Sequence, residues 1–592
     1  MITWTFEVDF DRDSVYEAAL TAYVSRPGSG VAIRRGMNPD GVYEVSSMTL
    51  QLNNSTDVFN SRNTSSTYYG QMTPDTPCRV TVSHNSNSYT MWTGYIASWK
   101  RQWQSGNVPM VAIQCRDIAH YIINSDSVNV AVATNRDTDG ALNAILDAWE
   151  DTSGTDYIGA GLRQFDDGLQ DLPFHYVIGQ KVMEAMMAVV RSEPGLLWVD
   201  ALGRLRFEAR DSRLGSTPDD TWGDGTDVFP ITIDDLTNDL DYVTSVRART
   251  SVFSEGQADL EVFRFSRHAS TGDSLAIAAG ETYIRSFQLP TATTAITTPV
   301  ATTDYRGNSA IDGSGTNKTA ELDVEVTVNG AGYFTLRVTN TDASTVYLTL
   351  FRLRGQPVDQ FYGEHPEAFV EMSVPGRAGG KGVEIDKPFA GDGNTYQLLE
   401  DAYQMLRTYR YPVERMTMTF IPTTTTAIDK LLAVELGQLI QFTDSERSID
   451  ELYRVETLEY HIPPDWAGQS FQIVVGFTPS YIYRNMDAIA LDLFDRANAT
   501  GDLGSTTNAI AWANDTGFDI VSEAARANTD TLSMATVNLG TGITDQVVEV
   551  SLAAIGTGDE VGGVLRYTDA NNQVRFYLDK GSNELILEKN VA

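Results

Sequence analysis

Apolar and polar residues alternate in short runs over residues 1–125, which is the pattern of strands with one buried face. Stretches rich in Asn, Ser, Pro, Asp and Gly separate these runs, and such residues favour turns. The sequence therefore predicts antiparallel β-structure for this part of the chain. The runs are TWTFEVDF, EVSSMTLQL, CRVTVSH, TMWTGYIASW and MVAIQCRD.

The apolar pattern changes to helical spacing between residues 126 and 250. Apolar side chains recur at i, i+3, i+4 and i+7 in two segments, which predicts two amphipathic helices. The second helix is expected to end at Pro194-Gly195. After it, LLWVDALGRLRFEAR predicts a hairpin whose turn spans Asp200–Gly203. The two helical stripes are Leu142, Ile145, Leu146 and Trp149, and Val182, Ala185, Met186, Val189 and Val190.

Strands dominate the remainder of the chain. Long alternating runs joined by NGAG and NTDAST turns predict an inserted β-sandwich, and one helix, NTYQLLEDAYQMLRTYR, precedes four further strands. The last domain ends without a closing turn, so we expect part of it to lie beyond residue 592. The predicted fold class is mainly β with a few helices, over domains 1–125, 126–250, 251–355, 356–482 and 483–592.

The composition narrows the classes of partner. The chain has 592 residues and a formal net charge of −36, from 43 Lys and Arg against 79 Asp and Glu. A field of this sign repels phosphates, so general nucleic-acid binding is not expected. No apolar run reaches membrane-spanning length, and MITWTFEVDFDRD at the start lacks the basic and apolar regions of a secretion signal. We therefore expect a soluble chain.

The sequence carries no local signature of catalysis. Its six histidines form no HExxH or HxH pair, and it has no GxSxG elbow. GRAGGKG at 376–382 lacks the spacing of a phosphate loop, and DTDG at 137–140 fails as a calcium loop because Ala148 holds the twelfth position. Carboxylates in PDDTWGDGTD are interpreted as solvated turn residues rather than calcium ligands. These carboxylates are Asp219, Asp220, Asp224 and Asp227. We predict no catalytic residue, no cofactor and no metal.

The stretch MWTGYIASWKRQW at 91–103 places Gly94 inside a strand, where glycine marks a bulge or a close backbone approach. Together with YEVSSMTLQLNNSTDVFN and STYYGQMTPDTPCRVTVSH, it resembles the N-terminal part of the phage tail-tip hub family, where these segments build half of a split β-barrel. Pro74-Asp75 stands where the family usually has Pro-Gly. The matching positions are Asn53, Asn54, Phe59, Pro74, Pro77, Arg79, Gly94 and Trp99.

Further segments resemble the same family in the same order along the chain. SEPGLLWVDALGRLRFEAR is similar to a family hairpin, and LGQLIQFTD, LYRVETLEYHI and SFQIVVGFTP are similar to the second barrel of the hub. The resemblance covers residues 1–482 in discontinuous pieces. DRANATGDLGSTTNAIAWANDTGFDIVSEAARA resembles the start of the jelly-roll, lectin-like domains of phage minor tail proteins.

The resemblance implies two split β-barrel hub domains, an inserted β-sandwich and a C-terminal jelly-roll-like domain. It implies a structural virion protein, not an enzyme, at the tail tip or baseplate of a long-tailed phage, assembled in the host cytoplasm and acting outside the cell. Gly94 would let its strand bend at a barrel corner. The implied partners are sister copies in a homotrimer, the tail tube, distal tail proteins, the tape-measure protein, central spike or fibre proteins, and host-surface glycan.

Trp512, Asn514 and Asp515 in AWANDTG are candidate glycan ligands, because sugar sites combine an aromatic platform with amide and carboxylate acceptors. Burial of Trp512 in its domain core is the favoured alternative. Two other functions stay open: a tail-associated cell-wall hydrolase and a carbohydrate-binding adhesin. The hydrolase would need an acid pair or a Cys/His pair in one pocket. Cys78 and Cys115 both lie in predicted strands, which argues against either cysteine as the nucleophile of a Cys/His pair.

Overall fold

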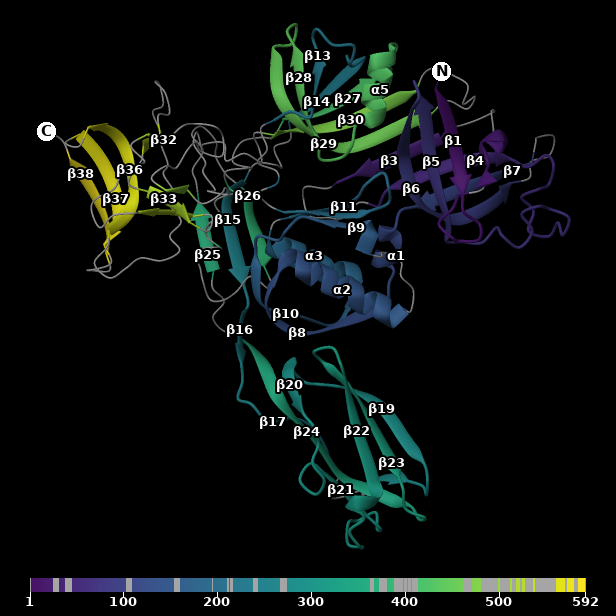
Figure 1. Ribbon diagram of the computed structural model, residues 1–592, viewed down its shortest axis with the longest axis vertical. Helices are drawn as coiled ribbons and strands as arrows, with labels where there is room; N and C mark the ends of the chain where they lie inside the picture. The colour runs from purple at the N-terminus through teal and green to yellow at the C-terminus, as the bar shows by residue number, and fades with distance from the viewer. Residues whose placement is uncertain are drawn as a thin grey trace. The chain divides into compact units, whose positions relative to one another are not determined.

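The computed structural model divides into two compact units, residues 1–482 and 483–592, whose elements are labelled in Figure 1. In the second unit the structure describes the backbone of 499–500, 512–513, 518–521, 524–527, 536–537, 560–569, 572–579 and 584–590. In the first unit it describes residues 2–16, 18–24, 31–37, 45–102, 109–153, 160–193, 195–209, 212, 217–237, 243–266, 274–361, 367–371, 381–387, 398, 402, 406, 414–462 and 471–480.

Within these described residues, thirteen strands form one sheet that contains both β-rich halves of the first unit. Its order is β14-β27-β30-β29-β3-β4-β7-β6-β5-β1-β2, with β28 on β29 and β13 on β28. The antiparallel pair β3–β29 joins the halves, with Ala32 opposite His461, and Figure 1 shows the two strands together. The strands are β1 (Thr3–Val8), β2 (Ala18–Ala19), β3 (Val31–Gly36), β4 (Ser47–Asn53), β5 (Thr76–His84), β6 (Asn87–Gln102), β7 (Met110–Arg116), β13 (Asp220–Gly223), β14 (Thr232–Thr237), β27 (Glu414–Phe420), β28 (Leu439–Asp444), β29 (Ile449–Ile462) and β30 (Gln472–Pro479).

Alternating side chains make one face of this sheet apolar, as the sequence pattern predicts. In β4, for example, Met48, Leu50 and Leu52 are buried and the residues between them are not. The buried residues of both halves form one core, in which Trp4 packs edge-on against Phe471 at 5.7 Å between ring centroids. The prediction of a mainly β, multidomain chain is confirmed. The structure adds that the two predicted barrels share a sheet and a core.

A smaller α+β region follows the first half. It contains the strand pair β8 (Ser127–Asp137) and β10 (Asp171–Lys181), and the sheet of β11 (Leu196–Val199), β12 (Leu205–Glu208) and β9 (Arg163–Phe165). The predicted helical stripes are buried in one core, and the hairpin β11–β12 forms as expected. Its helices are α1 (Ala119–Ile123), α2 (Thr138–Ser153) and α3 (Val182–Ser192), with a short 3-10 turn at Ala160–Leu162. Two further 3-10 turns lie elsewhere, at Thr21–Tyr23 in the first half and at Thr319–Glu321 in the sandwich.

The predicted β-sandwich is confirmed as two sheets that enclose an apolar core. Phe334 of one sheet stacks on Phe351 of the other at 6.1 Å between centroids. The first sheet is built on β24 (Val346–Phe361), which pairs with β16 (Val252–Glu255), β17 (Leu260–Ser266), β18 (Leu275–Ile277), β20 (Thr293–Thr297) and β21 (Tyr305–Asn308). The second has the order β19 (Thr282–Gln288), β23 (Tyr333–Asn340), β22 (Leu322–Asn329).

Chain segments on both sides of the sandwich form a separate small sheet. β15 (Val243–Thr250) lies between β25 (Glu367–Glu371) and β26 (Lys381–Lys387), and Leu398, Ala402 and Leu406 pack against it. The other residues of the predicted helix NTYQLLEDAYQMLRTYR, and most of GRAGGKG, lie outside the described residues. The helix α5 (Thr425–Ala433) begins after Thr424, whose hydroxyl accepts the N–H of Ala427 at 3.2 Å.

The second unit is described through its strands. β31 (Ala499–Thr500), β33 (Phe518–Val521) and β34 (Ala524–Ala527) form one sheet, and β32 (Trp512–Ala513) pairs with β35 (Thr536–Val537). β36 (Glu560–Asp569), β37 (Asn572–Asp579) and β38 (Glu584–Asn590) form an antiparallel meander. None of the helices in the described part of the chain is both long and apolar enough to cross a membrane.

Candidate functional site

The contacts that lock the two halves of the large sheet together form the candidate site, which we call the seam. It consists of Arg35 on β3, Glu208 on β12, Glu435 after α5 and Arg454 on β29. These residues come from the first half, the α+β region and the second half. The seam therefore joins three parts of the chain that are far apart in sequence.

Arg35 and Glu435 form a buried ion pair, in which Nη1 of Arg35 donates to Oε1 of Glu435. The Arg35 side chain is 1% exposed and the Glu435 side chain 27%. Burial alone lowers the pKa of Arg35, but the Glu435 carboxylate more than offsets this and the pKa is raised. The second carboxylate oxygen of Glu435 accepts the backbone N–H of Ala201 at 3.2 Å. One carboxylate thus holds the β11–β12 turn against the strand that joins the halves.

Arg454 and Glu208 form the second buried pair of the seam, with side chains 3% and 10% exposed. Nη2 of Arg454 donates to Oε2 of Glu208. Gly437, at φ +85°, lies against this pair, because a Cβ there would stand 3.2 Å from Nη2 of Arg454 and 3.7 Å from the Trp198 ring. A larger residue would be strained in this backbone conformation and would crowd the guanidinium.

A third contact joins the β5–β6 hairpin of the first half to α5 of the second. Nδ1 of His84 lies 2.8 Å from Oδ1 of Asp429, and the Tyr89 hydroxyl donates to the same oxygen at 3.1 Å. Burial raises the pKa of Asp429, but the hydrogen bonds, that of His84 foremost, bring it below its ordinary value. The next helix residue, Lys430, donates to Oδ1 of Asp220 at 2.5 Å. These charged contacts join α5 to the β5–β6 hairpin on one side and to β13 on the other.

Gly94 is required for close packing, which answers the question that its place in a strand raises. A Cβ at Gly94 would lie 2.4 Å from the Trp92 ring and 2.5 Å from the Arg116 carbonyl oxygen. Strand β6 continues through Gly94 to Gln102. Its register shifts lie on either side of Gly94, between Thr90 and Trp92 in the pairing with β5 and between Ile96 and Ser98 in the pairing with β7. The close backbone approach expected of a strand glycine is present, because Gly94 makes room for the buried Trp92 ring. The bend of the strand at Gly94 stays a prediction.

The other residues that carry the family resemblance organise the connection between β4 and β5. Oδ1 of Asn54 accepts the N–H of Phe59 at 2.8 Å, and Nε1 of Trp99 donates to the Thr73 carbonyl at 3.0 Å. Arg79 pairs with Glu7 across the neighbouring strand at 2.7 Å. These positions therefore support the fold of a long loop and a strand pair, and nothing in their contacts indicates catalysis.

The acids that the sequence marks as possible calcium ligands are used in structural contacts. Oδ2 of Asp219 accepts the N–H of Leu439 at 2.8 Å, Asp220 binds Lys430, and Asp224 accepts from Ser445. These bonds fasten the PDDTWGDGTD segment to β28, to the turn after it and to α5. Part of the segment is strand β13, paired with β28, and not a turn as the sequence suggested. Among the described residues, Asp9, Asp11 and Asp13 have carboxylate oxygens within 4.8 Å of one another, but Asp9 already accepts the N–H groups of Arg12 and Ser14.

The cysteines are unsuited to nucleophilic chemistry. Cys78 and Cys115 are both buried and free, and burial together with the neighbouring thiol raises the pKa of Cys78 well above its ordinary value. A buried thiol that resists ionisation is a poor nucleophile. The prediction that both cysteines act as small buried side chains fits these contacts.

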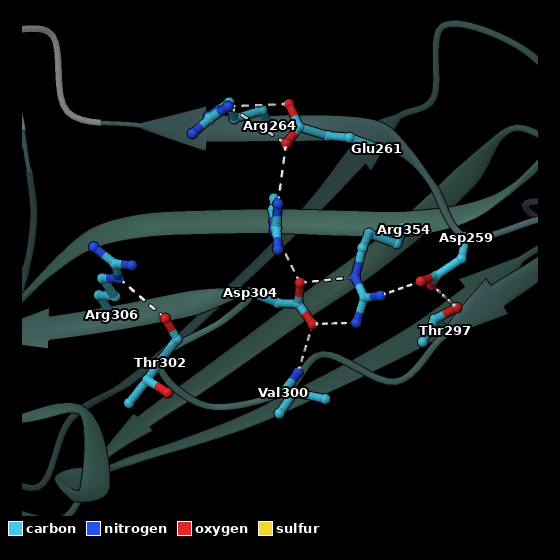
Figure 2. Close-up of polar contacts among 10 residues, drawn as sticks. Asp259, Glu261, Arg264, Thr297, Val300, Thr302, Asp304, Arg306 and Arg354 are labelled. Carbon is cyan, nitrogen blue, oxygen red and sulfur yellow. Dashed lines mark hydrogen bonds and ion pairs between the residues drawn. The ribbon is translucent and has the colours of Figure 1, made fainter.

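A polar cluster on the sandwich resembles a site but is saturated by its own members (Figure 2). Asp304 is 2% exposed and accepts from Nε of Arg352 at 2.9 Å, from Nε and Nη2 of Arg354, and from the N–H of Val300. Burial raises the pKa of Asp304, but these hydrogen bonds bring it below its ordinary value. Arg354 also binds Asp259. The cluster ties β21 to β24 and is best described as structural.

Of the predicted glycan ligands, the structure describes only the backbone of Trp512. Trp512 lies in β32, opposite Val537 of β35, and Asn514 and Asp515 lie outside the described residues. The glycan site stays a prediction. The seam residues were missed by sequence reasoning, and only the placement of Arg35 at a strand position with apolar neighbours, in VAIRRG, could have drawn attention to it.

No protein-family model and no curated protein matches the sequence. Similar solved structures include proteins described as tail proteins. The tail protein from Neisseria meningitidis MC58 is 10% identical with a TM-score of 0.44, over 81% of this chain and 98% of that one. The 43 kDa tail protein of prophage MuSo2 from Shewanella oneidensis is 11% identical with a TM-score of 0.42, over 81% and 99%.

A third similar structure is prophage tail protein gp18 from Listeria monocytogenes EGD-e, which is 8% identical with a TM-score of 0.38, over 80% of this chain and 94% of that one. Likeness at this level does not establish a function.

Proposed function

We propose that this chain is a structural virion protein, the tail-tip or baseplate hub of a long-tailed phage. The observation that supports this most directly is the single sheet that runs through both halves of the first unit and is locked by two buried Arg–Glu pairs. A sheet and a core that continue through both halves hold them together as one body, which suits an assembly component better than an enzyme with a moving cleft. The hub motifs along residues 1–482 support the same proposal.

The sheet also suits closure with sister copies. Among the described strands, its main order ends at β14 and at β2, and its branch from β29 ends at β13. Open strand edges pair readily with strands of another chain, and head-to-tail pairing of unlike edges closes a ring when the rotation allows it. We propose a homotrimer that continues the tail tube and binds the tape-measure protein, central spike or fibre proteins and distal tail proteins.

The second unit would face the host surface and bind its glycans. Trp512, Asn514 and Asp515 are the proposed ligands, on the sequence argument alone. The protein would assemble in the host cytoplasm and act at the cell surface as part of the virion. Proposed as a structural protein, it needs no cofactor.

A cryo-EM map of intact particles from the phage or prophage that encodes this chain tests the proposal. The expected result is density for three copies in a ring at the end of the tail tube. Particles that lack the chain, or that carry it away from the tube axis, would overturn the hub assignment. Clearing of cell-wall substrate by the purified chain in a zymogram would instead favour the hydrolase.

A further inference from the structure

Strand β10 has apolar side chains on both of its faces. Val177 is buried in the core that contains α2 and α3. Phe174, Tyr176 and Ile178 occupy alternate positions of the strand and lie on the opposite face. They pack against residues of the inserted sandwich instead. Strands that are apolar on both faces occur where both faces are covered, so the β8–β10 pair is a layer between the helices and the sandwich.

The contact between the α+β region and the sandwich has a small apolar core, which we call the joint. Phe253 of β16 lies edge-on to Tyr176 at 5.9 Å between ring centroids, and 6.3 Å from the Phe174 ring. The joint therefore removes from water a face of β10 that would otherwise be exposed, and this burial favours the contact. The sandwich residues buried in the joint are Phe253, Ala292, Ala331 and Val358.

The NGAG turn between β22 and β23 approaches β8 and β10 at backbone distance. The N–H of Ala331 donates to the Val130 carbonyl in β8 at 3.2 Å. A Cβ at Gly332 would lie 2.6 Å from the Ile178 side chain, which is too close for any residue with a side chain, so glycine is needed here. The turn thus joins the sandwich to the α+β region through the backbone as well as through apolar side chains.

The connection into the sandwich leaves little room for a flexible linker. β15 ends at Thr250 and β16 begins at Val252, so a single residue, Ser251, separates a strand of the small sheet from a strand of the sandwich. Thr250 is 1% exposed, and β16 is paired with β24 from its first residue. Domains that reorient freely are joined by exposed, flexible linkers, and this connection is of the opposite kind.

We propose that the inserted sandwich is a rigid arm, which the joint holds in one orientation on the α+β region. Relative motion is the default for domains in small, polar contact. Here the contact is apolar, it includes a backbone hydrogen bond, and a one-residue connection lies beside it. A swing of the sandwich would expose Phe174 and Ile178 to water and would take the acceptor from the Ala331 N–H.

The arm has a mechanical consequence for the whole first unit. Whatever contacts the outer end of the sandwich is held at a fixed place relative to β8 and β10, and a displacement of that end is passed on to the α+β region. The inserted sandwich is then part of the body of the protein and not a separately moving domain. This inference stands whether or not the chain is a tail hub.

Double electron–electron resonance between two spin labels tests the rigid arm in the purified full chain. Ile284→Cys on the sandwich and Leu169→Cys in the α+β region carry the labels, at positions 63% and 50% exposed. The native Cys78 and Cys115 are fully buried and do not compete for the label. We expect one narrow distribution of distances between the two labels. A broad distribution would overturn the rigid arm.

A charge placed in the joint should release the arm. Ala331→Asp puts a carboxylate at a position 1% exposed, where an unpaired charge is costly. Thr327→Asp, the matched control, puts the same charge at an exposed position of the same hairpin. We expect Ala331→Asp to broaden the distance distribution about twofold or more, as for a domain without a fixed interface, and Thr327→Asp to leave it narrow. Equal distributions for the two variants would overturn the role of the joint.

A second label pair shows whether the sandwich itself stays folded. Ile284→Cys with Leu260→Cys, which is 42% exposed on β17, lies within the sandwich and should keep its distance in Ala331→Asp. If this internal distance broadens, Ile178→Asp takes the place of Ala331→Asp, because it charges the joint from β10 and leaves the sequence of the sandwich unchanged. A narrow distribution between Leu169→Cys and Ile284→Cys in Ile178→Asp would then contradict the inference.

Discussion

Replacing Glu435 with alanine removes the carboxylate that neutralises Arg35 in the seam. The guanidinium, 1% exposed, would stay charged in an apolar surrounding, and the Ala201 N–H would lose its acceptor. Breaking a buried pair by removing one partner costs roughly 3–5 kcal/mol. Because Glu435 is 27% exposed and water can reach the vacated space, we expect the lower end, about 3 kcal/mol.

The chain has several domains, so a single global unfolding energy is poorly defined. Native-state hydrogen exchange of peptides from β3 and β29 measures the local opening energy instead. A loss of about 3 kcal/mol corresponds to a fall of about a hundredfold in the protection of these amides. Glu325→Ala, in the exposed pair with Arg337, serves as the control and should leave the seam amides unchanged.

A second substitution distinguishes the effect of the unpaired Arg35 charge from the effect of lost side-chain packing. Arg35→Met in the Glu435→Ala background removes the unpaired guanidinium while keeping an apolar side chain of similar length. We expect protection to recover by more than half, since apolar replacements of buried ion pairs are often neutral or stabilising. The interpretation of the seam is wrong if the β3 and β29 amides of the double variant are no better protected than those of Glu435→Ala. It is also wrong if these amides are as well protected in Glu435→Ala as in the control.

Three further substitutions probe other parts of the structure. Gly94→Ala should lower the free energy of unfolding by about 2 kcal/mol, because the added Cβ would overlap the Trp92 ring. Gly161→Ala is the control, since no atom lies within 4 Å of its added Cβ, and it should change the melting temperature little. Equal falls in melting temperature for the two variants would refute the packing argument. Asp304→Ala should lower the local opening free energy of the sandwich by about 2 kcal/mol, because buried hydrogen bonds are lost. Hydrogen exchange should then be faster for the amides of β24 but not for those of β29. Burial, and then the charge of Arg136, lower the pKa of His175 to about 3, so the folded state resists protonation that the unfolded state accepts below about 6.5. The free energy of unfolding should therefore fall as the pH drops from about 6.5 towards 3. Between pH 7 and pH 4.5, the melting temperature of His175→Phe should fall less than that of the unsubstituted chain. Equal falls in melting temperature would contradict the pKa shift.

The helical segments of the α+β region could be predicted from the sequence because their signal is local. Apolar residues at helical spacing, such as Leu142 and Leu146, are buried wherever the helix packs. The hairpin β11–β12 could be predicted for the same reason, from its turn residues Asp200–Gly203 and the apolar strands on either side. Each of these elements is specified within a stretch of about twenty residues or fewer, so no knowledge of distant contacts is needed.

The seam could not be predicted in this way. Arg35 and Glu435 are separated by 400 residues, and a charged residue in a strand is ordinarily interpreted as exposed. Only the fold that pairs β3 with β29 brings Arg35 and Glu435 close enough to form an ion pair. Likewise, Gly94 was recognisable as unusual, but the Trp92 ring that requires it is placed by the fold of its own strand and by β7.

The sequence by itself determined the class of the fold and the positions of the main strands and helices, and it singled out Gly94, Asn54 and Phe59 before their contacts were known. Those features depend on backbone preference and on alternation along one segment. Tertiary structure alone decided that the two β-rich halves share a single sheet and that buried ion pairs lock it. Charge pairing and burial depend on distances in space, which the order of residues along the chain does not contain.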